Sequence, residues 1–184
     1  MDYTLIRSHR RTMALEIKNG ELFLRVPLRT TQAQIRQFLI QHQSWIENHM
    51  ARAQQRQEEL ARCPVLSEQE LAELTRQAKA VIPQRVAHFA PLVGVTYGNI
   101  TIRHQRTRWG SCSGRGNLSF NCLLMLAPLE VLDAIVVHEL CHRKEMNHSS
   151  RFYGEVLRIL PDYHARHAWL KEHGDELLAR LPEF

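Results

Sequence analysis

The chain has 184 residues, of which 44% are hydrophobic and 23% charged, and its formal net charge is +5 at pH 7. This length and apolar content suit one compact domain with an appendage and are enough for a real core. No apolar run approaches the length of a membrane span, and the first residues lack the charged-then-apolar pattern of a secretory signal.

The beginning of the chain is predicted to form a β-hairpin. Residues 12–18 and 21–26 alternate between apolar and polar side chains, as half-buried strands do. Asn19-Gly20 between them is a strong signal for a type I′ turn. Residues 3–7 are a candidate third strand.

Helices are predicted to follow the hairpin. Thr30 or Thr31 can cap a helix with an apolar stripe, and the polar residues 51–62 are expected to continue as an exposed helical extension. Pro64 ends it. We therefore expect residues 1–64 to form a separate N-terminal domain of a β-hairpin and a helical segment.

The next stretch is predicted to contain one long helix and two strands. Residues 67–70 form a capping-box pattern at the start of the helix, which Pro83 should kink or split and Pro91 should end. Strands are predicted over residues 100–102 and 118–124, with a tight turn before the second.

Three helices are predicted after these strands. One spans about residues 128–145, the next starts at Ser149 or Ser150, and the last follows Pro161. Strands followed by helices indicate an α+β fold with a short antiparallel sheet, here over residues 65–184.

The first of these helices carries a metal-binding motif. His138 and His142 stand four residues apart and so project from one helical face, at a separation that lets two imidazoles reach one tetrahedral zinc. Glu139 lies beside the first histidine, where it can reach a metal-bound water without binding the metal. This is the HExxH pattern of zinc hydrolases, with two ligands and a general base.

Several motifs around HExxH carry a family resemblance. They are RWGSC at residues 108–112, VVHELCH at 136–142 and NHS at 147–149, with Asn121, Leu124 and Phe152. In this order they resemble the YgjP-like metallopeptidase domain, a group related to the SprT-like and WLM zinc proteases. The resemblance runs from about residue 67 to about residue 174 and takes in the N-terminal hairpin loosely. Cys141 departs from the pattern, because a small Ala is commoner there.

The resemblance implies a small zincin-like fold that binds Zn²⁺ through His138, His142 and His148, with Glu139 as the general base. In zincins an edge strand lies above the zinc and pairs with an extended substrate. Residues 117–122 are placed to play that role, which would give main-chain hydrogen bonds with little side-chain selectivity.

The third ligand has more than one candidate. His148 lies six residues after His142, the spacing of the H-E-x-x-H-x-x-G-x-x-H motif. Glu155 is the alternative, since related zincins take a glutamate from a following helix. His164 and His167 are more distant candidates and are expected to be surface residues.

Further residues are candidates for substrate binding and for support of the ligands. Arg103–Arg108 is a basic cluster, and on an alternating strand Arg106 and Arg108 would share a face, where they could hold a carboxylate or a phosphate. Asn121 is a further candidate for substrate contact. Asn147 and Glu155 are candidates for residues that do not bind the metal but orient its ligands through hydrogen bonds.

Three functions fit these observations. The first is a zinc metallopeptidase that cleaves a peptide or protein in extended form, including an anionic one. The second is a zinc-dependent phosphoanhydride hydrolase that clamps a nucleotide with the arginine cluster. The third is a metal- or nucleic-acid-binding module with little catalysis, which the modest positive charge supports only weakly.

The cysteines bear on the compartment. Cys63, Cys112, Cys122 and Cys141 form no CxxC pair and no disulfide framework, so we expect a reducing cytoplasm and no membrane association. The sequence does not indicate an oligomeric state.

Overall fold

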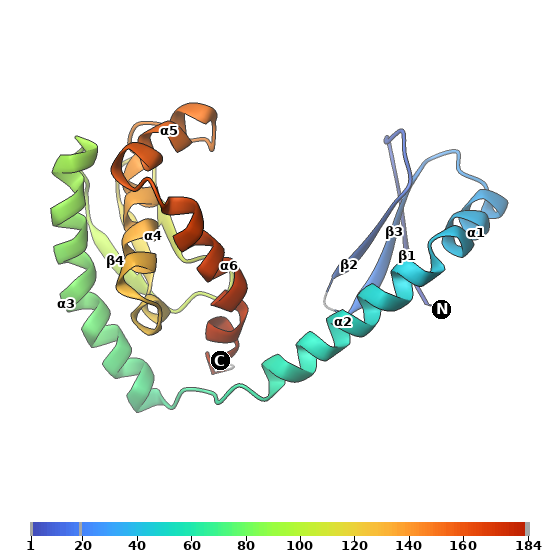
Figure 1. Ribbon diagram of the computed structural model, residues 1–184, viewed down its shortest axis with the longest axis horizontal. Coiled ribbons are helices and arrows are strands. Elements are labelled where there is room, and N and C mark those ends of the chain that lie inside the picture. Colours follow the sequence, from blue (N-terminus) through green and yellow to red (C-terminus); the bar gives the residue numbers. More distant parts are fainter. Residues whose placement is uncertain (1, 19, 183–184) are drawn as a thin grey trace. The chain divides into compact units, whose positions relative to one another are not determined.

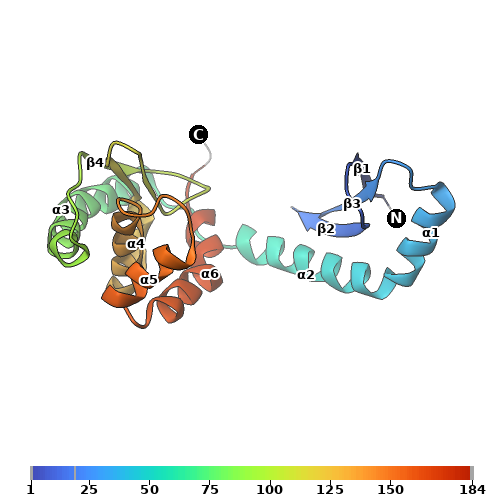
Figure 2. The same ribbon diagram turned by 90° about the horizontal axis from the view of Figure 1, so that it is seen from above.

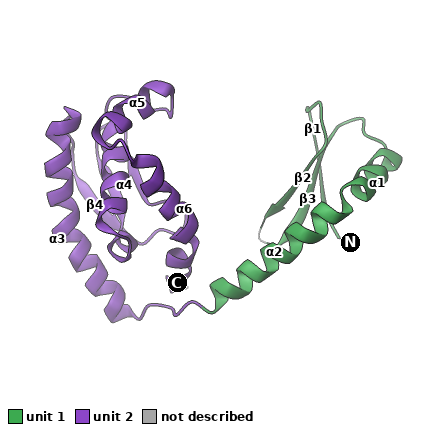
Figure 3. Cartoon of the chain, in the orientation of Figure 1, with its two compact units in different colours: residues 1–62 green, residues 63–184 purple. Residues whose placement is uncertain are grey.

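The computed structural model describes residues 2–18 and 20–182, so Asn19 of the predicted turn lies outside the described residues. The chain divides into two compact units, residues 1–62 and 63–184 (Figures 1 and 3). This division follows Arg62, whereas the sequence placed the domain boundary after Pro64.

Unit 1 contains a three-stranded sheet. Its strands are β1 (Thr4–Ser8), β2 (Ala14–Lys18) and β3 (Glu21–Pro27), in the order β1-β3-β2. The β2–β3 pair is the predicted antiparallel hairpin, while β1 pairs with β3 in parallel. Leu24 and Val26 of β3 are fully buried, which makes the central strand the core of this unit.

Two helices complete unit 1, namely α1 (Gln32–Gln41) and α2 (Gln43–Ala61). Thr31 caps α1: its hydroxyl accepts a hydrogen bond from the Gln34 N–H at 3.3 Å, and the Gln34 side chain accepts one from the Thr31 N–H at 2.9 Å. Ile35 on the inner face of α1 is fully buried and joins the core of the sheet.

Unit 2 begins with α3 (Glu68–Val93), one helix that passes both Pro83 and Pro91. The prediction that Pro91 ends this helix is wrong, and Pro83 does not divide it. Residues such as Val86 on the same helix are fully buried, so packing outweighs the hydrogen bonds that the prolines remove. The helix ends at Gly94, whose φ of 81° is left-handed and favours glycine.

The second sheet lies in unit 2 and has the order β4-β6-β5. Its strands are β4 (Ile100–Arg103), β5 (Gly110–Cys112) and β6 (Leu118–Asn121), and a 3-10 helix, η1 (Cys122–Leu126), follows. Because β6 pairs in parallel with β4 and antiparallel with β5, the prediction that residues 117–122 offer a free edge is wrong. The edge strands are β4 and β5, and of these β5 is the one that packs beside α4.

The HExxH helix, α4 (Leu129–Cys141), is the central element of unit 2. It lies between α3 and α6 (Tyr163–Ala179) in both views (Figures 1 and 2) and also contacts β5 and α5 (Ser150–Ile159). It ends at Cys141, four residues before the predicted end, and His142 is its C-cap.

A buried ion pair ties α4 to α3. Arg85 donates from Nε and Nη2 to the two carboxylate oxygens of Asp133, both at 2.7 Å, and Asp133 is only 7% exposed. This bidentate ion pair offsets the desolvation cost of the buried Asp133 carboxylate, and it holds α3 and α4 together. Helices packed around a small sheet confirm the predicted α+β class, but the sheet is mixed and not antiparallel as predicted, because β4 and β6 are parallel. Among the described residues, no helix combines the length and apolarity needed to cross a membrane.

Candidate metal centre

The motif residues line a cavity of about 280 Å³ between α4 and the edge strand β5. Its lining consists of Arg108, Gly110, Ser111, Cys112, His138, Glu139, His142, Met146 and His148. The HExxH residues come from the end of α4, the backbone of β5 forms another wall, and His148 comes from the loop before α5.

The three histidines point their ring nitrogens at one another. Nε2 of His138 lies 3.2 Å from Nε2 of His142 and 3.1 Å from Nε2 of His148. Ligand atoms of all three lie within 4.8 Å of one another. Tetrahedral zinc with Zn–N bonds of about 2.0–2.1 Å separates its nitrogen ligands by roughly 3.3 Å, so these positions fit one zinc-sized cation.

The opposite ring nitrogens explain why these faces are free to bind a cation. Nδ1 of His142 lies 3.1 Å from the carbonyl oxygen of Glu145, which can only accept, so this Nδ1 carries the proton. Nε2 of the neutral His142 ring is then unprotonated, and its lone pair is available to a cation. Nδ1 of His138 lies 2.8 Å from the hydroxyl of Tyr163. This contact orients the His138 ring so that its Nε2 also faces the other histidines.

Burial keeps the imidazoles of His138 and His142 neutral. It lowers the pKa of His138 to about 3, with further lowering from His142 and His148, and it also lowers the pKa of His142. Protons therefore compete poorly for the inward-facing nitrogens at neutral pH. Neutral nitrogens packed this closely repel one another unless a cation lies between them, and the donor set fits zinc.

Glu139 lies beside this cluster but outside it. Its side chain is buried, and burial raises its pKa to about 8, while the nearby Arg108 opposes that shift. Gly110 of β5 packs directly on the carboxyl group: a Cβ built on Gly110 would lie 2.5 Å from Oε1 of Glu139. The glycine of the RWGSC motif therefore leaves the space that Glu139 occupies.

Glu155, the alternative third ligand, lies elsewhere. Its Oε2 accepts hydrogen bonds from Nζ of Lys144 at 2.8 Å and from Nη2 of Arg158 at 3.0 Å. These two cations lower its pKa. The structure thus brings His148, and not Glu155, to the other two histidines, and it gives Glu155 no contact with them.

The arginine cluster is divided between two roles. The chain leaves β4 after Arg103, so Arg106 and Arg108 do not share a strand face as predicted. Nη2 of Arg106 donates to the carbonyl oxygens of Leu181 and Pro182 at 2.8 and 2.9 Å. Arg106 does not line the cavity, and its part in substrate binding stays a prediction. Arg108 lines the cavity next to Glu139.

Asn121 is structural, contrary to the sequence prediction. It is fully buried, and its amide nitrogen donates to the carbonyl oxygens of Gln105 at 2.6 Å and Arg108 at 3.3 Å, while its oxygen accepts from the Leu123 N–H. A substrate cannot reach a side chain buried in this way. Asn121 instead fixes the backbone of the segment that carries Arg108.

Asn147 is the last of the predicted site residues, and Trp109 belongs to the RWGSC motif. Asn147 is exposed, and within the described part of the chain its side chain makes no hydrogen bond, so its predicted support of the His148 loop is not seen. Trp109 packs in the core against Gly174 of α6, where an added Cβ would lie 3.2 Å from its ring.

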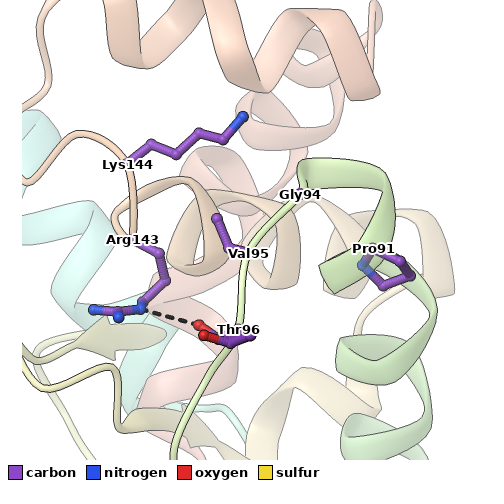
Figure 4. Close-up of a pocket in the computed structure, with 6 residues that line it drawn as sticks. All are labelled: Pro91, Gly94, Val95, Thr96, Arg143 and Lys144. Atoms are coloured by element: carbon purple, nitrogen blue, oxygen red, sulfur yellow. Dashed lines mark hydrogen bonds between the residues drawn. The ribbon is translucent and has the colours of Figure 1, made fainter.

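Arg143, directly after the motif, ties the site to the sheet. Its Nε donates to the carbonyl oxygen of Thr96 at 3.1 Å (Figure 4), and Nη1 donates to that of Gly114 at 3.4 Å. Gly114 belongs to the turn between β5 and β6, so these bonds hold the end of β5 near the end of α4. A separate hollow of about 570 Å³ lies beside them, between Gly94 and Lys144.

Sequence reasoning missed Tyr163. It lies 25 residues beyond His138, at the start of α6, and no spacing rule connects a tyrosine there to the motif. Tyr163 is nearly fully buried, and burial raises its pKa, so its hydroxyl stays protonated.

Tyr163→Phe should weaken zinc binding by about 10- to 100-fold, because the His138 ring loses the partner that fixes its orientation. Competition against a chromogenic chelator would measure this. Tyr153→Phe is the matched control, since the Tyr153 ring lies in the same aromatic cluster without bonding a ligand. Equal zinc affinity in the two variants would contradict the role of Tyr163.

The model of the family described as YgjP-like, metallopeptidase domain, matches residues 11–71 and 66–173. Among solved structures, the chain is similar to the metallopeptidase zymogen abylysin of Pyrococcus abyssi, with 20% identity and a TM-score of 0.46 over 50% of this chain and 94% of that one. No curated protein matches.

Proposed function

Because the chain belongs to the YgjP-like metallopeptidase family, we propose that it is a zinc-dependent peptidase that uses Glu139 as its general base. The observation that carries this proposal is the convergence of three histidine nitrogens next to a buried carboxyl group. His138, His142 and His148 would hold the metal. A structural zinc site would be closed, usually by thiolates, and would need no Glu139.

Bound zinc would supply Lewis acidity and lower the pKa of a water to about 7. Glu139 then accepts the proton of the attacking water and delivers it to the leaving amine. Its buried position against Gly110 holds the carboxylate in one place, so little reorganisation is needed when the proton moves. Arg108 at the rim adds positive charge that favours the ionised form of Glu139.

The substrate would lie along β5. Within the described sheet, β5 pairs only with β6, so its other edge can accept an extended chain. Gly110, Ser111 and Cys112 of this strand line the cavity beside Glu139. Main-chain pairing would therefore bring a peptide bond to the site with little dependence on side chains, as a peptidase that acts on unfolded segments requires.

The arginine cluster supports phosphoanhydride cleavage less well. A phosphate clamp needs several free cations, and Arg106 is committed to two backbone carbonyls. Arg108 alone remains at the cavity. We also place the protein in the cytoplasm, because Cys63, Cys112, Cys122 and Cys141 are all free thiols.

A paired activity panel tests the function. The full chain, purified without chelator and assayed for zinc by elemental analysis, should cleave members of an unstructured peptide library and leave nucleoside triphosphates intact. Removal of zinc by a chelator should stop cleavage, and restored zinc should recover it. Triphosphate hydrolysis without peptide cleavage would overturn the peptidase in favour of the nucleotide hydrolase.

A further inference from the structure

Most of the net positive charge of the chain belongs to unit 1, whereas the metal centre belongs to unit 2. Residues 1–62 contain ten Lys and Arg against six Asp and Glu, a net charge of +4 of the +5 of the whole chain. The other two thirds of the chain are nearly neutral. Such asymmetry indicates an anionic partner for the smaller unit.

The topology of unit 1 gathers part of this charge at one end of its sheet. Because β1 and β3 are parallel, with Ser8 paired to Pro27, the connections after both strands leave from the same end. The first connection carries His9, Arg10 and Arg11, and the second carries Arg29. We call Ser8, His9, Arg10, Arg11 and Arg29 the basic tip. A hollow of about 390 Å³ lies there, lined by Ser8, His9, Arg10, Pro27, Leu28 and Arg29.

Arg7 ties strand β1 to the second connection of the tip. Its Nη1 donates to the carbonyl oxygens of Leu28 at 3.0 Å and Thr30 at 2.9 Å. Arg7 therefore has a structural role, because it holds the backbone on both sides of Arg29. Arg29 and Arg11 are exposed, so their guanidinium groups can meet a ligand.

Arg10 carries an unsatisfied donor in this hollow. Its Nε is buried, and no hydrogen-bond acceptor lies within reach in the described structure. A buried guanidinium N–H without an acceptor is costly, which singles this group out for explanation. No Asp or Glu lines the hollow, and Glu16 on the neighbouring β2 is already bonded to Arg25 at 2.7 Å. No acidic side chain lining the hollow therefore competes with an anionic ligand for Arg10.

We propose that the basic tip binds the phosphodiester backbone of a nucleic acid. Arginine forks match phosphate oxygens in geometry and charge, and the hydroxyl of Ser8 adds a neutral donor beside them. No Phe, Tyr or Trp lines the hollow, so the large rings on which bases usually stack are missing there. The tip therefore contacts backbone phosphates and does not read sequence.

This inference does not depend on the peptidase chemistry. The tip lies in unit 1, whereas the metal centre lies in unit 2, and each can be disabled without the other. A nucleic acid held by unit 1 would keep the peptidase near proteins bound to the same strand, because both units belong to one chain.

Fluorescence anisotropy of the full chain with a labelled short duplex tests the proposal. Binding should weaken as salt rises. A plot of log K against log[salt] should be linear, with a slope of about −0.9 for each phosphate contact. Arg10→Ala with Arg29→Ala should weaken binding at every salt concentration and reduce that slope by about two. Lys18→Ala with Arg52→Ala removes the same charge from exposed positions outside the tip and should bind like the wild type.

Three results would overturn the proposal. They are equal binding by the two double variants, the same affinity at low and high salt, and stronger displacement of the duplex by an acidic peptide than by unlabelled duplex. The last would assign the tip to acidic polypeptides. Thermal melting guards against misfolding: because the Arg10 Nε has no acceptor, Arg10→Ala should not lower the Tm of the free protein.

Discussion

Replacing Glu139 with Gln should abolish hydrolysis, with a loss in kcat of about 10²-fold or more, while zinc stays bound. An amide cannot accept the proton of water as a carboxylate does, and Glu139 is outside the cluster of three histidines. Initial rates on the best peptide of the library, together with zinc content, would measure both parts of the prediction.

The fold should survive this change. Burial raises the pKa of Glu139 to about 8, so in the metal-free protein at pH 7 most of the carboxyl group is already neutral. Gln has nearly the same shape and no charge to bury. Glu130→Gln, an identical change at an exposed position of the same helix, is the matched control and should keep full activity. Peptide turnover by the Glu139 variant near the control rate would remove Glu139 from the role of base.

His148→Ala should release the zinc, because it removes one of three nitrogens that converge on the site. Glu155→Ala should leave zinc bound, since its carboxylate is held by Lys144 and Arg158. The side chain of Glu155 is 30% exposed, so we expect the loss of these ion pairs to cost only about 1 kcal/mol or less of stability.

Zinc competition and thermal melting of the two variants separate these effects. The His148 variant should lose metal affinity, whereas the Glu155 variant should lose at most a little stability. A Glu155 variant without zinc, beside a His148 variant that retains it, would reverse the assignment of the third ligand.

Several local signals in the sequence were reliable guides to local structure, although Pro91 did not end its helix as predicted. The reciprocal cap of Thr31 and Gln34 and the pairing of His138 with His142 depend on residues three and four apart, and both are seen. His148 needed more than helical geometry, because it follows α4 in a loop. The HExxH spacing and the family resemblance together pointed to it.

Long-range pairing could not be read from the sequence in the same way. Strand order in the sheet depends on contacts between segments, so β6 was assigned to the edge when it is central. Arg106 and Arg108 are chemically equivalent and two residues apart, but only Arg106 meets the backbone of Leu181 and Pro182, about 75 residues later. Tyr163 was missed for the same reason.

The contact of Arg106 with the end of the chain has a practical consequence. Residues 181 and 182 secure the segment that delivers Arg108 to the cavity, and the carbonyl oxygen of Arg180 also accepts from the Leu66 N–H at 2.8 Å. Cleavage by trypsin after Arg180 would therefore detach a support of the cleft while sparing every histidine. When two preparations differ in activity, intact mass spectrometry should first show whether the residues after Arg180 are still present. Only then can the difference be ascribed to metal content.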